Sequence, residues 1–97
     1  MTKADIIKEV SEMTGLTKVE TEAVFDGIIE SISSALKKNE RVDIRGFGNF
    51  TIKYRSARQA RNPATNEILS LEDRYVPVFK VSKLLKDKVN KSLLRGF

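Results

Sequence analysis

The chain has 97 residues and a formal net charge of +5, and it contains neither cysteine nor histidine. This length suits a single domain, and the missing side chains exclude disulfides, thiolate metal sites and the commonest general base. No apolar run approaches the roughly 20 residues of a membrane-spanning helix, and the first residues lack the apolar core of a secretion signal. We therefore expect a cytoplasmic protein with no membrane partner, no metal and no cofactor.

Charge is distributed unevenly along the chain. Residues 1–40 carry 5 Lys/Arg against 8 Asp/Glu, a balance of −3, whereas residues 41–97 carry 13 against 5, a balance of +8. A basic half on a small domain is typical of nucleic-acid binders and, less often, of proteins that bind anionic membranes. The distribution predicts a polyanionic partner for the second half.

Two capped helices are predicted at the start of the chain. Thr2 and Asp5 form an imperfect capping box for the first helix, and Gly15 is a left-handed stop. Thr17 and Glu20 form a complete capping box for a second helix. Its apolar face, at helical spacing, is formed by Phe25, Ile28, Ile29, Ile32 and Leu36. These signals predict a helical hairpin.

Alternating apolar and polar residues then predict a sheet. Residues 41–45 form a strand, 46–49 a turn and 50–54 the antiparallel partner. Residues 75–79 resume an apolar run, in which Pro77 indicates an edge strand or a bulge. A last helix is expected beyond this sheet, capped by Ser82 and running from Lys83 to about Leu94.

A basic arm is expected between the strands, over residues 55–74. From Arg55 to Asn66 the sequence has three arginines, no acid and no large apolar group except the ring of Pro63. Such a segment cannot bury a core of its own, so it is mobile in water or lies against an anion. Beyond it, Leu69 and Leu71 alternate with polar residues, which predicts a two-stranded ribbon with its tip at Asn62-Pro63.

The arm has the chemistry of a DNA ligand. Arginine suits phosphate because its planar fork donates paired hydrogen bonds and stays charged. Arg55, Arg58 and Arg61 are expected to follow a sugar-phosphate backbone or to enter a narrow groove. Pro63 offers a rigid apolar wedge, and inserting such a wedge costs about a few kcal/mol per unstacked base step. The alternative is a solvated basic hairpin with an ordinary turn proline.

Three segments resemble the HU/integration host factor family of bacterial DNA-bending proteins: Gly46-Phe47-Gly48-Asn49-Phe50, Ala60-Arg61-Asn62-Pro63-Ala64-Thr65 and Val76-Pro77-x-Phe79-Lys80. The resemblance covers the whole chain. It implies an α+β fold in an intertwined dimer, with a three-stranded antiparallel sheet and a long β-ribbon arm. The single domain 1–97 would comprise a helical dimerisation base at 1–40, the sheet with its arm at 41–81, and a short C-terminal helix and tail at 82–97.

The resemblance also implies roles for individual residues. Pro63 would intercalate in the minor groove of double-stranded DNA, and the other arm contacts would be Arg55, Arg58, Arg61, Asn62, Thr65 and Arg74. Flanking phosphates would be held by Lys3, Lys53, Lys80, Lys83 and Lys86. For these lysines the alternative is a solvated face, and Lys3 is also placed to pair with Asp26, as in some relatives. The dimer core would include Phe47, Phe50 and Phe79, for which base stacking is the alternative.

Some segments resemble the β-type subunit of integration host factor more closely than HU: Arg41-Val42-Asp43-Ile44-Arg45, Tyr54-Arg55 and Tyr75-Val76-Pro77. In that subunit an acid and an arginine at the positions of Asp43 and Arg45 help to discriminate sequence. By analogy, Asp43 would orient Arg45 toward the minor groove, where it would sense DNA shape. The alternative is an exposed pair without functional weight.

We predict a non-enzymatic, largely sequence-tolerant protein that bends and compacts DNA in the bacterial nucleoid as a homodimer. A subunit of a site-selective heterodimer, acting in recombination, replication or transcription, is the nearest alternative. A structured-RNA binder is more remote. A phosphate-handling enzyme is disfavoured because the sequence has no Walker motif, no metal-ligand cluster and no histidine.

Overall fold

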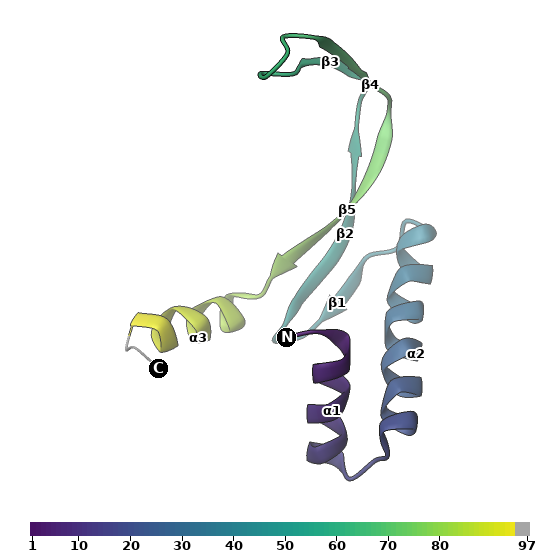
Figure 1. The fold of residues 1–97 in the computed structure, drawn as a ribbon, viewed down its shortest axis with the longest axis vertical. Helices are drawn as coiled ribbons and strands as arrows, with labels where there is room; N and C mark the ends of the chain where they lie inside the picture. Colours follow the sequence, from purple (N-terminus) through teal and green to yellow (C-terminus); the bar gives the residue numbers. More distant parts are fainter. Residues whose placement is uncertain (95–97) are drawn as a thin grey trace. The chain divides into compact units, whose positions relative to one another are not determined.

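The structure is a computed structural model that describes residues 1–94 (Figure 1). Its elements follow the order α1, α2, β1, β2, β3, β4, β5 and α3. The chain divides into two compact units, Met1–Ala35 and Leu36–Phe97. Among the described residues, no helix is long and apolar enough to cross a membrane.

The first unit is built on two capped helices, α1 (Lys3–Thr14) and α2 (Lys18–Lys37). Both halves of the Thr2–Asp5 capping box are present, and Gly15 ends α1 in the left-handed conformation with φ 78°. In the second box the Thr17 amide donates to Glu20 Oε1 at 3.0 Å, and the Glu20 amide donates to Thr17 Oγ1 at 3.1 Å. Four orphan amides of these helix starts are thereby satisfied, and the predicted hairpin is confirmed.

The helices bury little of their apolar surface. Ile7 is the one buried hydrophobic residue among residues 1–94. The buried hydroxyls of Ser11 and Thr21 donate to backbone carbonyls one turn earlier. On α2, Val24 and Ile28 are each more than half exposed. A single chain therefore has almost no hydrophobic core, which is far less burial than an independent domain of this size needs.

The second unit contains a three-stranded antiparallel sheet in the order β1 (Val42–Ile44), β2 (Gly48–Arg55) and β5 (Arg74–Val81). Pro77 lies on the edge strand β5, opposite Ile52, as its missing amide hydrogen requires.

The turn into β2 is shorter than predicted. It comprises residues 45–47, because Gly48 already pairs with Ile44 on one side and Val81 on the other. Arg45 therefore lies in the turn and outside the strand. A side chain at Gly48 would meet the Lys80 carbonyl at 2.5 Å, so close approach explains this glycine.

The arm consists of a second sheet, in which β3 (Arg58–Arg61) pairs with β4 (Ile68–Leu71). The single ribbon expected over residues 55–74 is wrong in this detail, because the chain leaves the strand conformation at 56–57 and again at 72–73. Figure 1 shows the β2–β5 ribbon leading into the β3–β4 ribbon. The register is the same on both sides of the break, since Arg55 faces Arg74 and Arg58 faces Leu71, so the ribbon is interrupted without a shift of its strands.

The last element is helix α3 (Lys83–Leu94), with the bounds predicted from the sequence. Ser82 caps it, since its hydroxyl accepts the Leu85 amide at 3.1 Å. The Ser82 amide donates to the Phe47 carbonyl at 2.9 Å, which ties the start of α3 to the β1–β2 turn. Residues 95–97 of the predicted tail lie outside the described residues.

Candidate nucleic-acid interface

The tip of the arm is a hydrogen-bonded turn that presents Pro63. The Asn62 amide donates to the Glu67 carbonyl at 2.8 Å, and the Asn66 amide donates to the Asn62 carbonyl at 2.7 Å. Asn66 has φ 61°, a left-handed conformation that asparagine tolerates and the turn requires. The side chain of Asn62 accepts the Ala64 amide at 2.9 Å. Pro63 is exposed at the first position of this closed turn, where its fixed φ suits the backbone.

The neighbouring residues of the tip divide into structural and exposed ones. Asn62 is half-buried and closes the turn with its backbone and its side chain. Thr65 is exposed. Arg61 donates to the Asn66 side-chain oxygen at 3.3 Å, a neutral partner that leaves the arginine charge uncompensated. The tip therefore combines one apolar ring with a cation and several small polar groups.

Three predicted arginines come together at the root of the arm. Arg55, Arg58 and Arg74 line one open hollow of about 500 Å³, together with Tyr54 and Ser56. Arg55 and Arg74 are register partners on β2 and β5. Within residues 1–94 no ion pair involves an arginine of the arm. The concentration of fixed positive charge favours an anionic ligand with several phosphate groups.

Asp73 lies in the break between the two ribbons, a role that the sequence analysis did not assign to it. Its carboxylate accepts the Ala57 amide at 2.5 Å. Interaction with the Tyr54 hydroxyl and then with the Ala57 amide lowers the pKa of Asp73, and the same interaction with Asp73 raises the pKa of Tyr54. The signal in the sequence was the pair Glu72-Asp73, which interrupts the strand alternation and is disfavoured in strands.

The expected aromatic cluster is formed within one chain. The Phe79 ring lies 5.2 Å from that of Phe47 and 4.9 Å from that of Phe50, in tilted arrangements. Phe47 is 46% exposed and Phe79 42% exposed. The three rings contact one another but remain partly exposed to solvent in the single chain. Exposed apolar clusters of this kind are typical of protein–protein interfaces.

Asp43 pairs with Arg41 in the unbound chain. It accepts a hydrogen bond from Arg41 at 3.2 Å, and this pair is exposed. Arg45 lies two residues on, in the turn, where it lines an open hollow that Asp43 and Asn49 also line. The described residues show Asp43 Oδ1 bonded to Arg41 and show no bond between Asp43 and Arg45, so the orientation of Arg45 by Asp43 stays a prediction.

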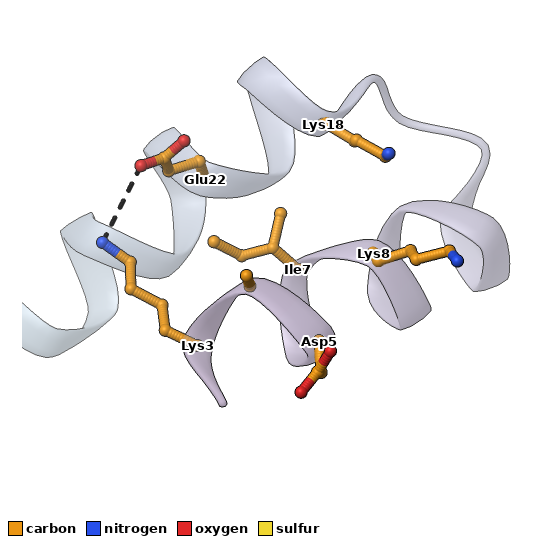
Figure 2. A pocket seen from close by; sticks show the side chains of 7 residues that line it. Lys3, Asp5, Ile7, Lys8, Lys18 and Glu22 are labelled. Carbon is orange, nitrogen blue, oxygen red and sulfur yellow. Dashed lines mark ion pairs between the residues drawn. The ribbon is translucent and has the colours of Figure 1, made fainter. Parts of the chain in front are cut away.

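The lysines of the body differ in their surroundings. Lys3 Nζ lies 2.8 Å from Asp26 Oδ1 and 3.8 Å from Glu22 Oε1, so the expected Lys3–Asp26 pair is present. These two acids, mainly Asp26, raise the pKa of Lys3. Lys3 lines a hollow of about 430 Å³ together with Ile7 and Lys8. Figure 2 shows these side chains and the Lys3–Glu22 ion pair. Four other lysines are exposed and have no carboxylate partner in the described part of the chain: Lys53, Lys80, Lys83 and Lys86.

These features define a class of protein. The chain carries a cationic hairpin with an apolar tip at the end of its sheet. This arrangement defines a histone-like DNA-binding protein without enzymatic activity. The chain belongs to the family of bacterial DNA-binding proteins that includes HU and integration host factor, because the family model described as "Bacterial DNA-binding protein" matches residues 1–90.

Similar proteins are named DNA-binding protein HU. The chain is 45% identical over 91 residues to the DNA-binding protein HU of Clostridium pasteurianum, which covers 94% of this chain and 100% of that protein. It is also 45% identical over 87 residues to the DNA-binding protein HU of Streptococcus mutans, covering 90% and 96%.

Solved structures agree in fold. A cocrystal structure of Anabaena HU with DNA matches with a TM-score of 0.83 and 36% identity, covering 92% of this chain and 97% of that one. HU from Thermotoga maritima matches with a TM-score of 0.65 and 31% identity, covering 92% and 98%. The predicted α+β fold and the predicted family are thus confirmed.

Proposed function

We propose that this chain acts as a homodimer that bends and compacts double-stranded DNA, with one arm from each copy lying in the minor groove. The observation that carries the proposal is the arm itself, a closed hairpin that ends in an exposed proline and holds uncompensated arginines. The arginines and the proline have different roles. Phosphate is bound by charge, and base steps are separated by an apolar ring.

The arm contacts act at two levels. Arg55, Arg58 and Arg74 hold the sugar-phosphate backbone at the root, and the tip contacts come from Arg61, Asn62 and Thr65. Pro63 enters between base steps, a wedge mechanism of which HU and integration host factor are themselves known examples. Unstacking costs about a few kcal/mol per step, and the additional contacts of the bent duplex offset this cost.

A second copy supplies the missing core. Phe47, Phe50 and Phe79 form a half-exposed cluster, and α2 leaves Val24 and Ile28 uncovered. Covering a large apolar side chain stabilises a protein by about 1.5–3 kcal/mol, so a handful of such residues on each copy suffices for a stable dimer. Residues 1–40 form the helical base of this dimer, 41–81 the sheet with its arm, and 82–97 the last helix and tail.

The body extends the contact beyond the arms. Lys53, Lys80, Lys83 and Lys86 attract flanking phosphates, and the last two lie in the first turn of α3, where the helix dipole also favours anions. Lys3 contributes after it leaves Asp26. These contacts are independent of sequence, so they add affinity and salt dependence in place of selectivity.

Binding is largely sequence-tolerant. The HU relatives named above favour a self-sufficient homodimer over a site-selective heterodimer of the integration host factor type. Arg45 lies outside the strand, and the Asp43 carboxylate is engaged by Arg41, which weakens the analogy to the β-type subunit. Any readout by Asp43 and Arg45 is therefore of groove shape. We place the protein on the bacterial nucleoid.

The test is energy transfer between the two ends of a doubly labelled duplex of arbitrary sequence, titrated with this chain alone at low and physiological salt. A strong approach of the ends supports a self-sufficient, sequence-tolerant bending homodimer. Binding without any approach of the ends at either salt overturns bending. Bending on one sequence alone, or only after a related subunit is added, supports the heterodimer.

A further inference from the structure

The arm is joined to the sheet by a segment without strand pairing. The β2–β5 ladder ends at Arg55 and Arg74, and the β3–β4 ladder begins at Arg58 and Leu71. Residues 56–57 and 72–73 lie between them and belong to neither ladder. A joint without ladder bonds lets an arm take many directions. Binding in one pose then costs conformational entropy, and this cost lowers the affinity.

One side chain spans this joint. The Asp73 carboxylate accepts the Ala57 amide across 16 positions of sequence. The bond has an ionised acceptor, a type that is shorter and stronger than a neutral hydrogen bond. It links the outgoing side of the arm to the returning side at the point where the ladder bonds are missing.

The aromatic pair next to the joint supports the same carboxylate. Tyr54 and Tyr75 are register partners, and their ring centroids lie 5.3 Å apart at an interplanar angle of 58°. The Tyr54 hydroxyl interacts with Asp73 strongly enough to dominate the pKa changes of both groups. The carboxylate is therefore held between an aromatic pair in the β2–β5 ribbon and a backbone amide that leads into β3.

The charge of Asp73 has no other evident use in this position. The neighbouring arginines attract DNA, and an acid among them repels phosphate. Yet Asp73 forms no ion pair with Arg55, Arg58 or Arg74 within residues 1–94. Asp73 repels phosphate and neutralises none of these arginines. Its presence here is explained by the hydrogen bond that it accepts from the Ala57 amide.

We propose that Asp73 is a positioning residue for DNA bending: its carboxylate fixes the β3–β4 arm to the end of the β2–β5 ribbon, so that Pro63 meets the duplex in one pose. The inference rests on the proposed function, because a pose of the arm has meaning only if the arm contacts DNA. The residue acts through the backbone at Ala57 and touches no DNA itself.

The experiment compares Asp73→Ala with Glu72→Ala in the full-length chain. Both changes remove one negative charge at adjacent positions, but among residues 1–94 the side chain of Glu72 makes no hydrogen bond or ion pair. Affinity is measured by fluorescence anisotropy, and bending by energy transfer between the ends of the duplex. Asp73→Asn is the conservative variant, since its amide oxygen still accepts the Ala57 amide.

A positioning role and a charge effect give opposite results. Removing an acid near DNA strengthens binding by charge alone, and Glu72→Ala is expected to bind equally or slightly more tightly. Asp73→Ala is expected to bind about three- to tenfold more weakly, as the loss of one well-formed hydrogen bond predicts, with less energy transfer at saturation. Asp73→Asn is expected to recover most of the energy transfer. Equal gains in affinity for both alanine variants would overturn the proposal.

Backbone dynamics of the unbound protein provide a second readout. In Asp73→Ala the ¹⁵N relaxation of β3 and β4 should show increased motion, while residues 48–52 of β2 keep their values. Unchanged relaxation in the arm would also overturn the proposal. Failure of the proposed function is recognised separately, because in that case the unmodified chain would bind without bending DNA.

Discussion

Arg55 and Arg74 lie directly opposite each other at the last rung of the β2–β5 ladder, and both line the hollow at the root of the arm. Like charges at opposite strand positions destabilise a sheet by about 0.2–1 kcal/mol. The described part of the chain provides no carboxylate partner for either. A phosphate between them would replace this repulsion with two attractive contacts, so binding at this position would relieve the repulsion.

This relationship predicts opposite effects of one substitution on folding and binding. Arg74→Gln should leave the melting temperature equal or slightly higher, because the repulsion is removed. It should weaken binding to all sequences alike and reduce the slope of log K against log salt by about 1. Arg41→Gln is the matched control, since Arg41 pairs with Asp43 outside the arm. An unchanged salt slope in Arg74→Gln would show that Arg74 contacts no phosphate.

Replacing Pro63 separates bending from affinity. Pro63→Ala retains the cations of the arm but removes the ring that unstacks bases, so most of the affinity should remain while energy transfer between the DNA ends decreases. Pro77→Ala is the control, because it is the same change on the edge strand β5, away from the tip. An undiminished bend in Pro63→Ala would contradict the wedge role.

The helix bounds and the tip of the arm could be predicted because their signals are local. The Thr17–Glu20 box and the Ser82 cap each act within three residues, and both are present in the structure. The turn at Asn62-Pro63 is also local: Asn66 closes it in the left-handed conformation, with φ 61°, which asparagine tolerates. Such features depend on contacts between a side chain and the backbone of residues a few positions away, so the local sequence is enough to predict them.

The features that the sequence did not predict depend on strand register or on the choice of rotamer. The strand at Gly48 starts earlier than expected because Lys80 and Val81 approach it from 32 or more positions away. The joint in the arm depends on Asp73 reaching Ala57, and the partner of Asp43 depends on which of two nearby arginines has the better geometry. Register and rotamer decide these cases, and neither can be obtained from residue types.

Releasing Lys3 from its acidic partner should strengthen binding to long DNA. Lys3 and Asp26 form a short pair in which both side chains are about half exposed, so the pair contributes little to stability. Asp26→Asn should leave the melting temperature unchanged and increase affinity for a duplex long enough to reach the body. Affinity for a short duplex that meets only the arms should stay the same. Glu12→Gln is the control, because it makes the same charge change on α1 and Glu12 has no ion pair in the described part of the chain. An equal gain in both variants would indicate general electrostatics.

The joint at Asp73 should be insensitive to pH in the neutral range and fail at both extremes. The Tyr54 hydroxyl and the Ala57 amide lower the pKa of Asp73 below its ordinary value of 3.8, so its contribution is complete above that value and is lost as the pH falls through the lowered pKa. Asp73 raises the pKa of Tyr54 above its ordinary value of 10.0, so the contribution of this hydroxyl is complete below that value and is lost as the pH rises through the raised pKa.

The amide resonance of Ala57 reports this titration directly, because the Ala57 N–H donates a hydrogen bond to the Asp73 carboxylate. Its chemical shift should stay constant between about pH 5 and 9 and change in acid with a midpoint below 3.8. In Asp73→Asn the acid step should disappear. The carboxylates of the two capping boxes also have lowered pKa values, so overall stability decreases in the same acid range. For that reason the test is the resonance at the joint, and a midpoint at or above 3.8 would mean that the carboxylate does not hold the amide in solution.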